Sequence, residues 1–135
     1  MKLRTGQRRR LLCRLVLAAA TLAQLDAHAS DAAPAGVWHG ISICQQKNTA
    51  CRDEKVIYHL SAPDAAGKVS VSADKIVDGK PVSMGVLTFE YNKEQQTLEC
   101  VDGPRTWHLQ INGGTMNGTL MISGTLVRKV ELTKD

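Results

Sequence analysis

Short runs of β-branched and other apolar residues alternate with turn residues along the chain from Gly36 onward. Asp-Gly and Asn-Gly dipeptides in these turns favour tight hairpins, because their backbones tolerate positive φ angles. The runs recur at a spacing of about 8–12 residues, which is typical of an all-β sandwich or barrel. We therefore expect an antiparallel up-and-down barrel of about eight strands, with a β-sandwich as the alternative. The predicted strands are Val37–Cys44, Lys55–Ser61, Lys68–Val77, Val82–Tyr91, Thr97–Val101, Arg105–Ile111, Thr115–Ile122 and Thr125–Thr133.

Alternation of apolar and polar positions predicts which side chains share a face, because successive side chains of a strand point to opposite sides. In the last predicted strand, Arg128 shares a face with the apolar residues Leu126, Val130 and Leu132. In the first strand, Trp38 and Cys44 share one face, and Val37, Ile41 and Ile43 the other. Both faces of the first strand are therefore expected to be covered.

Residues 1–29 have the pattern of a secretory signal peptide. A basic segment precedes an apolar run from Leu15 to Leu25, and Ala27-His28-Ala29 offers small residues at a cleavage site before Ser30. The run is shorter than the about 20 residues that span a bilayer, so no transmembrane segment is expected in the mature chain. We expect export to a bacterial periplasm or the extracellular space, a flexible tail at 30–35, and a single barrel domain at 36–135.

Removal of this leader changes the charge of the chain. The full sequence has 17 basic and 13 acidic residues, and the leader contains six of the basic residues and one acidic residue. The mature chain would keep 11 basic and 12 acidic residues, a formal charge near −1 in place of +4. The basic balance thus belongs to the leader, and nucleic acid is not an expected partner.

Three cysteines remain after the leader, namely Cys44, Cys51 and Cys100. An oxidising compartment favours one disulfide and leaves one thiol. We predict the local pair Cys44–Cys51 at the end of the first hairpin, although the spacing leaves both pairings with Cys100 open.

Gly36-x-Trp38 opens the first strand, and Arg128 lies in the last strand. These strands are neighbours in a closed barrel, so we expect Arg128 to lie over the Trp38 ring and donate to backbone carbonyls. This arrangement resembles the calycin superfamily (lipocalins, fatty-acid-binding proteins, avidins), whose members share an opening Gly-x-Trp and often a last-strand Arg that packs on it. The chain also resembles small exported bacterial proteins that begin Gly-x-Trp-x-Gly and carry an early cysteine pair. The resemblance implies a barrel and no particular ligand class, since the loop motif of lipocalins is missing.

The first function hypothesis is a non-catalytic protein that binds a small apolar ligand inside the barrel, or an envelope protein at its rim. An eight-stranded barrel is either filled by side chains or holds one small ligand. The candidate ligand-binding residues are Trp38, Tyr58, Trp107 and Arg128; the alternative is that Trp38 and Arg128 only plug the barrel end. The second hypothesis is an interaction or inhibitor module, in which the disulfide-bounded loop 44–51 makes the contact.

Metal and catalytic chemistry find weaker support. If Ile43 pairs with Lys55, His39 falls opposite His59, but two imidazoles without a third ligand make a poor zinc site. The sequence has no nucleophile-elbow motif, and Asp53-Glu54 is expected to be a solvated loop. We expect neither a cofactor nor a catalytic residue.

Overall fold

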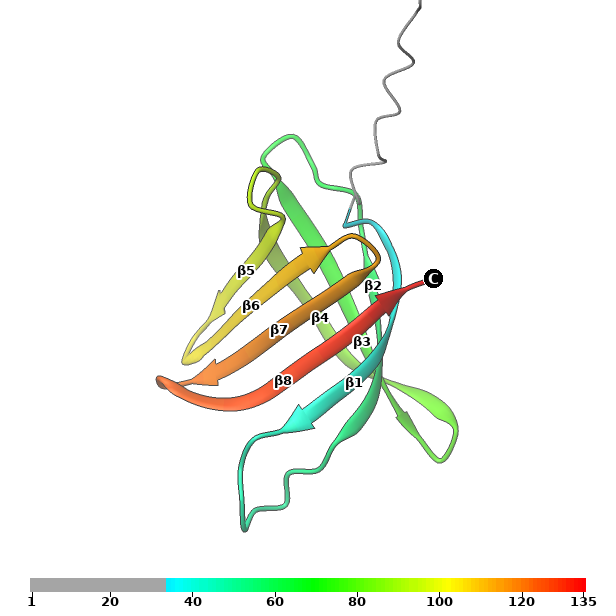
Figure 1. Ribbon diagram of the computed structural model, residues 1–135, viewed down its shortest axis with the longest axis vertical. Helices are drawn as coiled ribbons and strands as arrows, with labels where there is room; N and C mark the ends of the chain where they lie inside the picture. The colour runs from blue at the N-terminus through cyan, green and yellow to red at the C-terminus, as the bar shows by residue number, and fades with distance from the viewer. Residues whose placement is uncertain (1–33) are drawn as a thin grey trace, which may run out of the picture.

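The eight strands close into one antiparallel up-and-down barrel in the computed structural model, which describes residues 34–135 (Figure 1). Each strand pairs with the next, and β8 returns to pair with β1. This confirms the predicted fold class and excludes the sandwich. The strands are β1 (Gly36–Cys44), β2 (Glu54–Leu60), β3 (Lys68–Val77), β4 (Lys80–Asn92), β5 (Thr97–Asp102), β6 (Arg105–Asn112), β7 (Thr115–Ile122) and β8 (Thr125–Lys134). The predicted signal peptide and residues 30–33 lie outside the described residues.

Two of the tight turns follow directly from their sequence. Asp78-Gly79 joins β3 to β4 and Ser123-Gly124 joins β7 to β8, and both residues of each pair have positive φ. Two consecutive positive φ values define the hairpin turn whose twist matches that of the strands.

Within the described part of the chain, no helix is long and apolar enough to cross a membrane.

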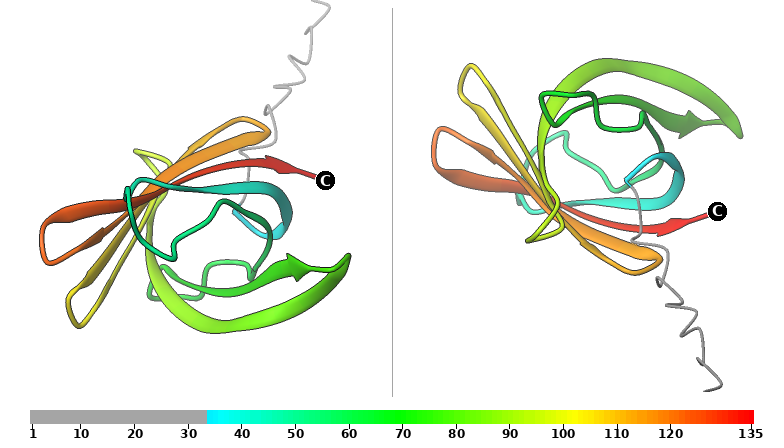
Figure 2. Two further views of the ribbon diagram at one scale, coloured as in Figure 1. Left: turned by 90° about the horizontal axis from the view of Figure 1, so that it is seen from below. Right: turned by 90° about the horizontal axis from the view of Figure 1, so that it is seen from above.

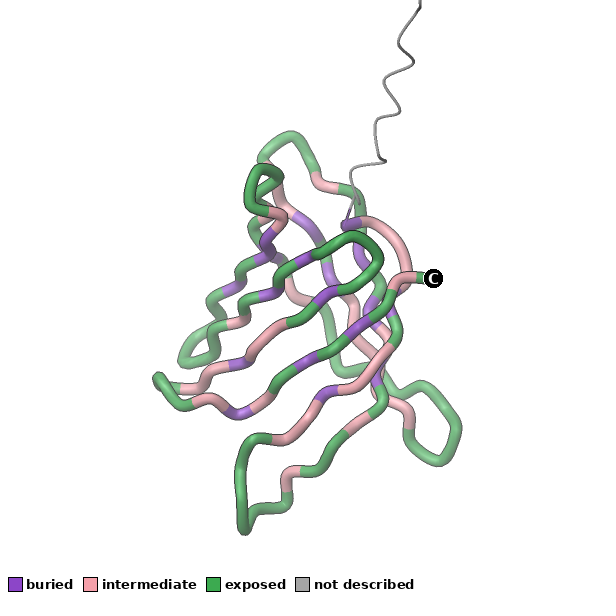
Figure 3. The backbone as a smooth tube through the Cα atoms, viewed as in Figure 1, coloured by how far each residue is buried: buried purple, intermediate pink, exposed green. Residues whose placement is uncertain are grey.

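The core occupies the barrel interior, and buried and exposed residues alternate along most strands (Figure 3). Trp38, Leu98, Leu109 and Met116 are among its largest fully buried side chains. A Cβ atom built on inward-facing Gly40 would lie 1.9 Å from the backbone oxygen of Glu131. Glycine at this position therefore allows β1 and β8 to approach closely where the barrel closes.

The alternation predicted for the last strand is wrong at its start. The register between β7 and β8 shifts at Leu120/Met121, so that Arg128 faces Leu120 and Leu126 faces Met121. Val127 is the extra residue and is buried, whereas Leu126 is only half-buried. A bulge inserts one residue and exchanges the faces on either side of it, which simple alternation cannot anticipate. Beyond the bulge, Val130 and Leu132 point inward as expected.

The first hairpin also has a different register from the one expected. Val37 faces His59, so His39 lies opposite Ile57, and the predicted facing pair His39–His59 is wrong. The two histidines remain on one face as diagonal neighbours, because a register change of two residues preserves the face of every side chain. The hydrophobic pattern thus sets the face and leaves this register open.

β4 and β5 are paired over only a short part of their length. β3 and β4 pair from Lys68↔Glu90 to Val77↔Lys80, whereas β4 and β5 share only the pairs of Glu90, Tyr91 and Asn92. From these pairs the two strands diverge, and the β3–β4 hairpin bends away from the barrel (Figures 1 and 2). The remainder of β4 is therefore not paired with the end of β5.

Candidate functional site

A cavity of about 220 Å³ lies inside the barrel. Most of its lining is apolar and includes aromatic rings from β2, β4 and β6, while its polar groups gather where β1, β2 and β8 come together. The lining residues are Ser42, Glu54, Tyr58, Val71, Ala73, Met84, Gly85, Leu87, Phe89, Trp107, Leu120 and Arg128. An apolar cavity with a few convergent polar groups is the usual form of a small-molecule site.

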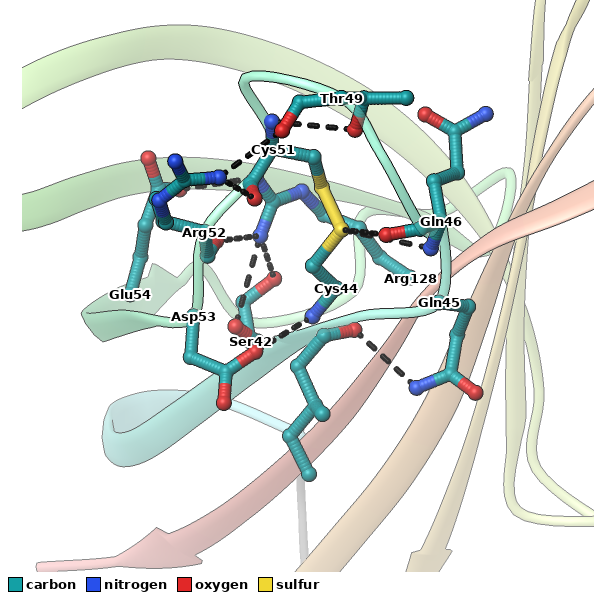
Figure 4. Close-up of a disulfide and its surroundings, with 11 residues drawn as sticks. Ser42, Cys44, Gln45, Gln46, Thr49, Cys51, Arg52, Asp53, Glu54 and Arg128 are labelled. Carbon is teal, nitrogen blue, oxygen red and sulfur yellow. Dashed lines mark hydrogen bonds and ion pairs between the residues drawn. A yellow bond between two sulfur atoms is a disulfide. The ribbon is translucent and has the colours of Figure 1, made fainter.

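Arg128 is the centre of the polar group (Figure 4). Its Nη1 donates to Ser42 Oγ at 3.1 Å and to the Arg52 carbonyl oxygen at 3.1 Å, with a longer contact of 3.4 Å to the Ser42 carbonyl oxygen. Its Nη2 lies 3.6 Å from Glu54 Oε2. Arg128 thereby ties β8 to β1, to the start of β2 and to the loop between them.

A second cation reaches the same carboxylate. Lys75 Nζ lies 3.5 Å from Glu54 Oε1, so Glu54 is held between Lys75 and Arg128. Glu54 is therefore a rim residue of the cavity rather than part of a solvated loop, which corrects the expectation from sequence. Asp53 is exposed as expected, and its Oδ1 accepts a hydrogen bond from the Cys44 backbone N–H.

The predicted disulfide Cys44–Cys51 is present and closes the loop above this cluster (Figure 4). The loop residues 45–50 are all exposed. At one end of the loop Gln45 N–H donates to the Val127 carbonyl, and at the other the Arg52 carbonyl accepts from Arg128. The disulfide thus holds both ends of the loop beside β8. Cys100 is a buried free thiol.

Tyr58 brings a phenol to the cavity lining. Burial raises the pKa of Tyr58 to about 12; the Arg128 guanidinium opposes this increase and the Glu54 carboxylate adds to it. The phenol therefore stays protonated at neutral pH and can donate a hydrogen bond, but it cannot act there as a base. With Glu54 held by two cations, the arrangement suits binding better than proton transfer.

Three of the four predicted ligand-binding residues, Tyr58, Trp107 and Arg128, line the cavity. Trp38 does not line it. Its ring is fully buried, and Nε1 donates to the Pro34 carbonyl oxygen at 3.0 Å. Pro34 is itself among the fully buried residues, so it packs with Trp38 although the sequence assigned it to the tail.

The expected contact between Arg128 and Trp38 is wrong. The residue over the Trp38 ring is Lys134, whose Nζ lies 5.5 Å from the ring centroid. In the β1–β8 register Trp38 faces Lys134, whereas Arg128 faces Cys44. Trp38 therefore lies near the start of β1, whereas Arg128 of β8 lies beside the last residue of β1, at the rim of the cavity.

Most of the apolar lining and the polar positions Ser42 and Glu54 were not predicted from the sequence. Small residues could have indicated the cavity, because Ala73 and Gly85 face each other across β3 and β4 and leave space inside the barrel. Ser42 lies four residues after Trp38, on the same face of β1, and is buried. A buried serine on the inner face of a strand needs a polar partner, and Arg128 is that partner.

The two histidines proposed as weak metal candidates have separate carboxylate partners. His39 Nδ1 lies 2.6 Å from Asp135 Oδ1, and His59 Nε2 lies 3.4 Å from Asp74 Oδ2. Over residues 34–135, no group of three or more His, Cys, Asp or Glu side chains could hold a metal ion.

No protein-family model matches this sequence, and a search of curated proteins finds no significant match. The closed eight-stranded antiparallel barrel is consistent with a calycin-like fold. Any function must accordingly be argued from the site itself.

Proposed function

We propose that this protein binds a small, largely apolar molecule in the barrel cavity. The observation that carries the proposal is the cavity of about 220 Å³, whose lining is mainly aliphatic and aromatic. A well-packed barrel of this size has no need for such a space, because interiors normally pack with few voids larger than a water molecule. The volume suits a compact ligand.

The rim adds a preference for one polar group on that ligand. Arg128 and Ser42 reach the cavity from β8 and β1, and the Tyr58 phenol lies on its wall. These groups would orient a hydrogen-bonding atom of the ligand toward the disulfide loop, with the apolar remainder against Leu87, Phe89 and Trp107. The calycin-like barrel supports this proposal, since such barrels can hold one small ligand.

Native mass spectrometry of the mature protein, purified from its own compartment without a reducing agent, tests the proposal. We expect a mass excess that disappears on denaturation and identifies the ligand class. Ala73→Phe would fill the cavity and abolish this excess, whereas Ala65→Phe, in an exposed turn, would retain it. Thermal melts must show that both variants fold. A bare mass for the wild type, or an adduct that survives in folded Ala73→Phe, would contradict the proposal.

A second candidate is an interaction or inhibitor module that uses the loop 44–51. It is favoured by the exposure of all residues from 45 to 50 and by the disulfide that joins the loop ends. A loop fixed at both ends loses less conformational entropy on binding. Replacing Gln46 and Lys47 would weaken the binding of such a partner and leave ligand binding in the cavity unchanged. Trp107→Ala would weaken ligand binding in the cavity and leave the binding of the partner unchanged.

Export to a periplasm or the extracellular space is part of the same proposal. The disulfide is compatible with an oxidising compartment. Cell fractionation with detection of the shortened chain would check it, and recovery of the full-length chain in the cytoplasm would contradict it.

A further inference from the structure

Tyr58 presents a polar group to the cavity that no other part of the barrel binds. The residue is 4% exposed and belongs to the cavity lining. Its hydroxyl makes no hydrogen bond with any residue from 34 to 135. In the same part of the chain, every side-chain nitrogen or oxygen that is fully enclosed by protein does have a hydrogen-bond partner. The Tyr58 hydroxyl is therefore in contact with the cavity space and can bond to a molecule there.

The strand register explains why there is space beside this phenol. The partner of Tyr58 on β1 is Trp38, whose indole is fully buried, and its partner on β3 is Ala73. Ala73 in turn pairs with Gly85 of β4. Paired residues of neighbouring strands share a face of the sheet, so a large ring supports Tyr58 on one side and two small residues follow on the other. Ala73 and Gly85 both line the cavity, and the phenol thus lies at its edge.

The charged groups of the cavity wall are already paired with each other. Glu54 and Arg128 are the charged residues of the lining, and Arg128 Nη2 lies 3.6 Å from Glu54 Oε2. Arg128 Nη1 already donates to three oxygen atoms of neighbouring residues. Lys75 does not line the cavity, is 37% exposed, and approaches the same carboxylate from β3. Arg52 and Asp53 bond through their side chains to backbone groups of the disulfide loop. A carboxylate in the cavity would therefore have to compete with Glu54 for Arg128.

The donor that Tyr58 offers suits an uncharged acceptor better than an anion. Burying a carboxylate is costly unless a cation and several hydrogen bonds compensate it, and the phenol supplies one neutral donor. A carbonyl oxygen costs much less to bury, and one hydrogen bond offsets most of that cost. Burial raises the pKa of Tyr58 to about 12, so the phenol keeps its proton at neutral pH. An apolar molecule without an acceptor would leave this donor without a partner.

We propose that the ligand of the cavity carries an uncharged carbonyl group, as in a ketone, an ester or an amide, and that the Tyr58 hydroxyl donates a hydrogen bond to the carbonyl oxygen. This inference rests on the proposed function, because it concerns a ligand in the same cavity. It identifies Tyr58, among the polar groups of the cavity, as the residue that determines specificity. The apolar part of the ligand lies over Ala73 and Gly85, and the ion pair of Glu54 and Arg128 stays intact and disfavours carboxylic acids.

Three two-ring compounds of similar size test the proposal on the whole mature protein. 2-Acetylnaphthalene carries an uncharged carbonyl, 2-isopropylnaphthalene carries a hydrocarbon group in its place, and 2-naphthoate carries an anion. Equilibrium dialysis at neutral pH gives the dissociation constants. Tyr58→Phe should weaken the binding of 2-acetylnaphthalene about fivefold, the usual effect of one hydrogen bond, and leave that of 2-isopropylnaphthalene unchanged. The wild type should bind 2-naphthoate more weakly than 2-acetylnaphthalene, and Glu54→Gln should reduce this difference.

Infrared spectroscopy provides a readout that is specific to the hydrogen bond. The carbonyl stretching frequency of bound 2-acetylnaphthalene should be lower in the wild type than in Tyr58→Phe, because a hydrogen bond weakens the carbonyl double bond. Tyr91→Phe is the matched control. It removes the same group from a tyrosine that does not line this cavity and whose hydroxyl accepts a hydrogen bond from Gln96. This variant should leave the affinities and the frequency unchanged, and thermal melts must show that every variant folds.

The possible outcomes separate this inference from the proposed function. If Ala73→Phe abolishes binding but Tyr58→Phe changes neither the affinity for 2-acetylnaphthalene nor its carbonyl frequency, the inference is wrong and binding in the cavity stands. An equal loss in Tyr58→Phe and Tyr91→Phe would also overturn the inference. Tighter binding of 2-naphthoate than of 2-acetylnaphthalene would do so too, because the preferred ligand would then be an anion. If none of the three compounds binds, both the proposed function and this inference fail.

Discussion

Lys134 Nζ lies 5.5 Å from the centre of the Trp38 ring, at the closed end of the barrel. Trp38 is fully buried beneath this contact, and its Nε1 is bonded to the Pro34 carbonyl. Arg128 instead faces Cys44, six residues further along β1. The two cations of β8 therefore have different roles. Lys134 covers a buried ring, and Arg128 joins β8 to β1 and to the start of β2 at the cavity rim.

Trp38→Ala should lower the free energy of unfolding by about 3–5 kcal/mol, because it leaves a large void in the core. Lys134→Ala should cost less than Trp38→Ala, because its contact with the ring is a surface cation–π contact, which contributes about 0.5–1 kcal/mol. Urea denaturation of both variants checks this difference. Equal losses would mean that the lysine stem, rather than the indole, closes the barrel end.

Arg128→Ala should lower the free energy of unfolding by about 1–3 kcal/mol, because Ser42 and the Arg52 carbonyl lose their donor. Arg128→Lys should recover only part of this loss, since an ammonium cannot reproduce the forked geometry of the guanidinium. Chemical denaturation of the two variants provides the measurement. A full recovery by lysine would show that charge alone matters at the rim.

Arg128 and Lys134 show how much of the fold can be predicted from the sequence. Alternation placed Arg128 on the inner face of the last strand, which is right, because side-chain direction repeats every two residues. Lys134 lies an even number of residues further along the same strand, so alternation allows either cation to reach Trp38. Which of the two cations reaches Trp38 depends on the register between β1 and β8. That register depends on contacts between strands that are distant in sequence.

The cavity illustrates the same limit. Tyr58 and Trp107 could be selected as lining residues because large aromatics on inward positions are few in this chain. Ala73, Gly85 and Ser42 create the space by being small, but their effect depends on facing one another within the closed barrel. The short pairing of β4 with β5 also could not be predicted from the sequence, because both segments have the ordinary composition of strands.

Gly40→Ala should destabilise the barrel by more than about 3 kcal/mol or prevent folding. The added methyl group would lie 1.9 Å from the Glu131 carbonyl oxygen, which is backbone and cannot rotate away. Gly114→Ala is the matched control, because nothing lies within 4 Å of the added atom there. Thermal melts should place the control near the wild type. A wild-type melting temperature for Gly40→Ala would show that β1 and β8 separate at no cost.

Cys100 should be the single thiol of the mature chain and should react slowly in the folded state. Burial, together with the nearby charge of Asp102, raises the pKa of the Cys100 thiol, and the thiolate is the reactive form. Denatured, unreduced protein should release one titratable thiol, and Cys100→Ser should release none. Two thiols in denatured Cys100→Ser would mean that Cys100 pairs with one of the loop cysteines.

Tyr58 should make the protein less stable at strongly alkaline pH. Its pKa rises from 10.0 to about 12 on folding, so between these values the folded state keeps a proton that the unfolded state releases. The stabilisation from the protonated phenol is complete below pH 10 and is lost as the pH rises toward 12, by about 2–3 kcal/mol. Urea denaturation at pH 8 and pH 11.5 should show a steeper loss in the wild type than in Tyr58→Phe, which has no phenol to ionise. The difference between the two proteins reports on Tyr58 alone, and parallel curves would place the Tyr58 phenol in water rather than on the cavity wall.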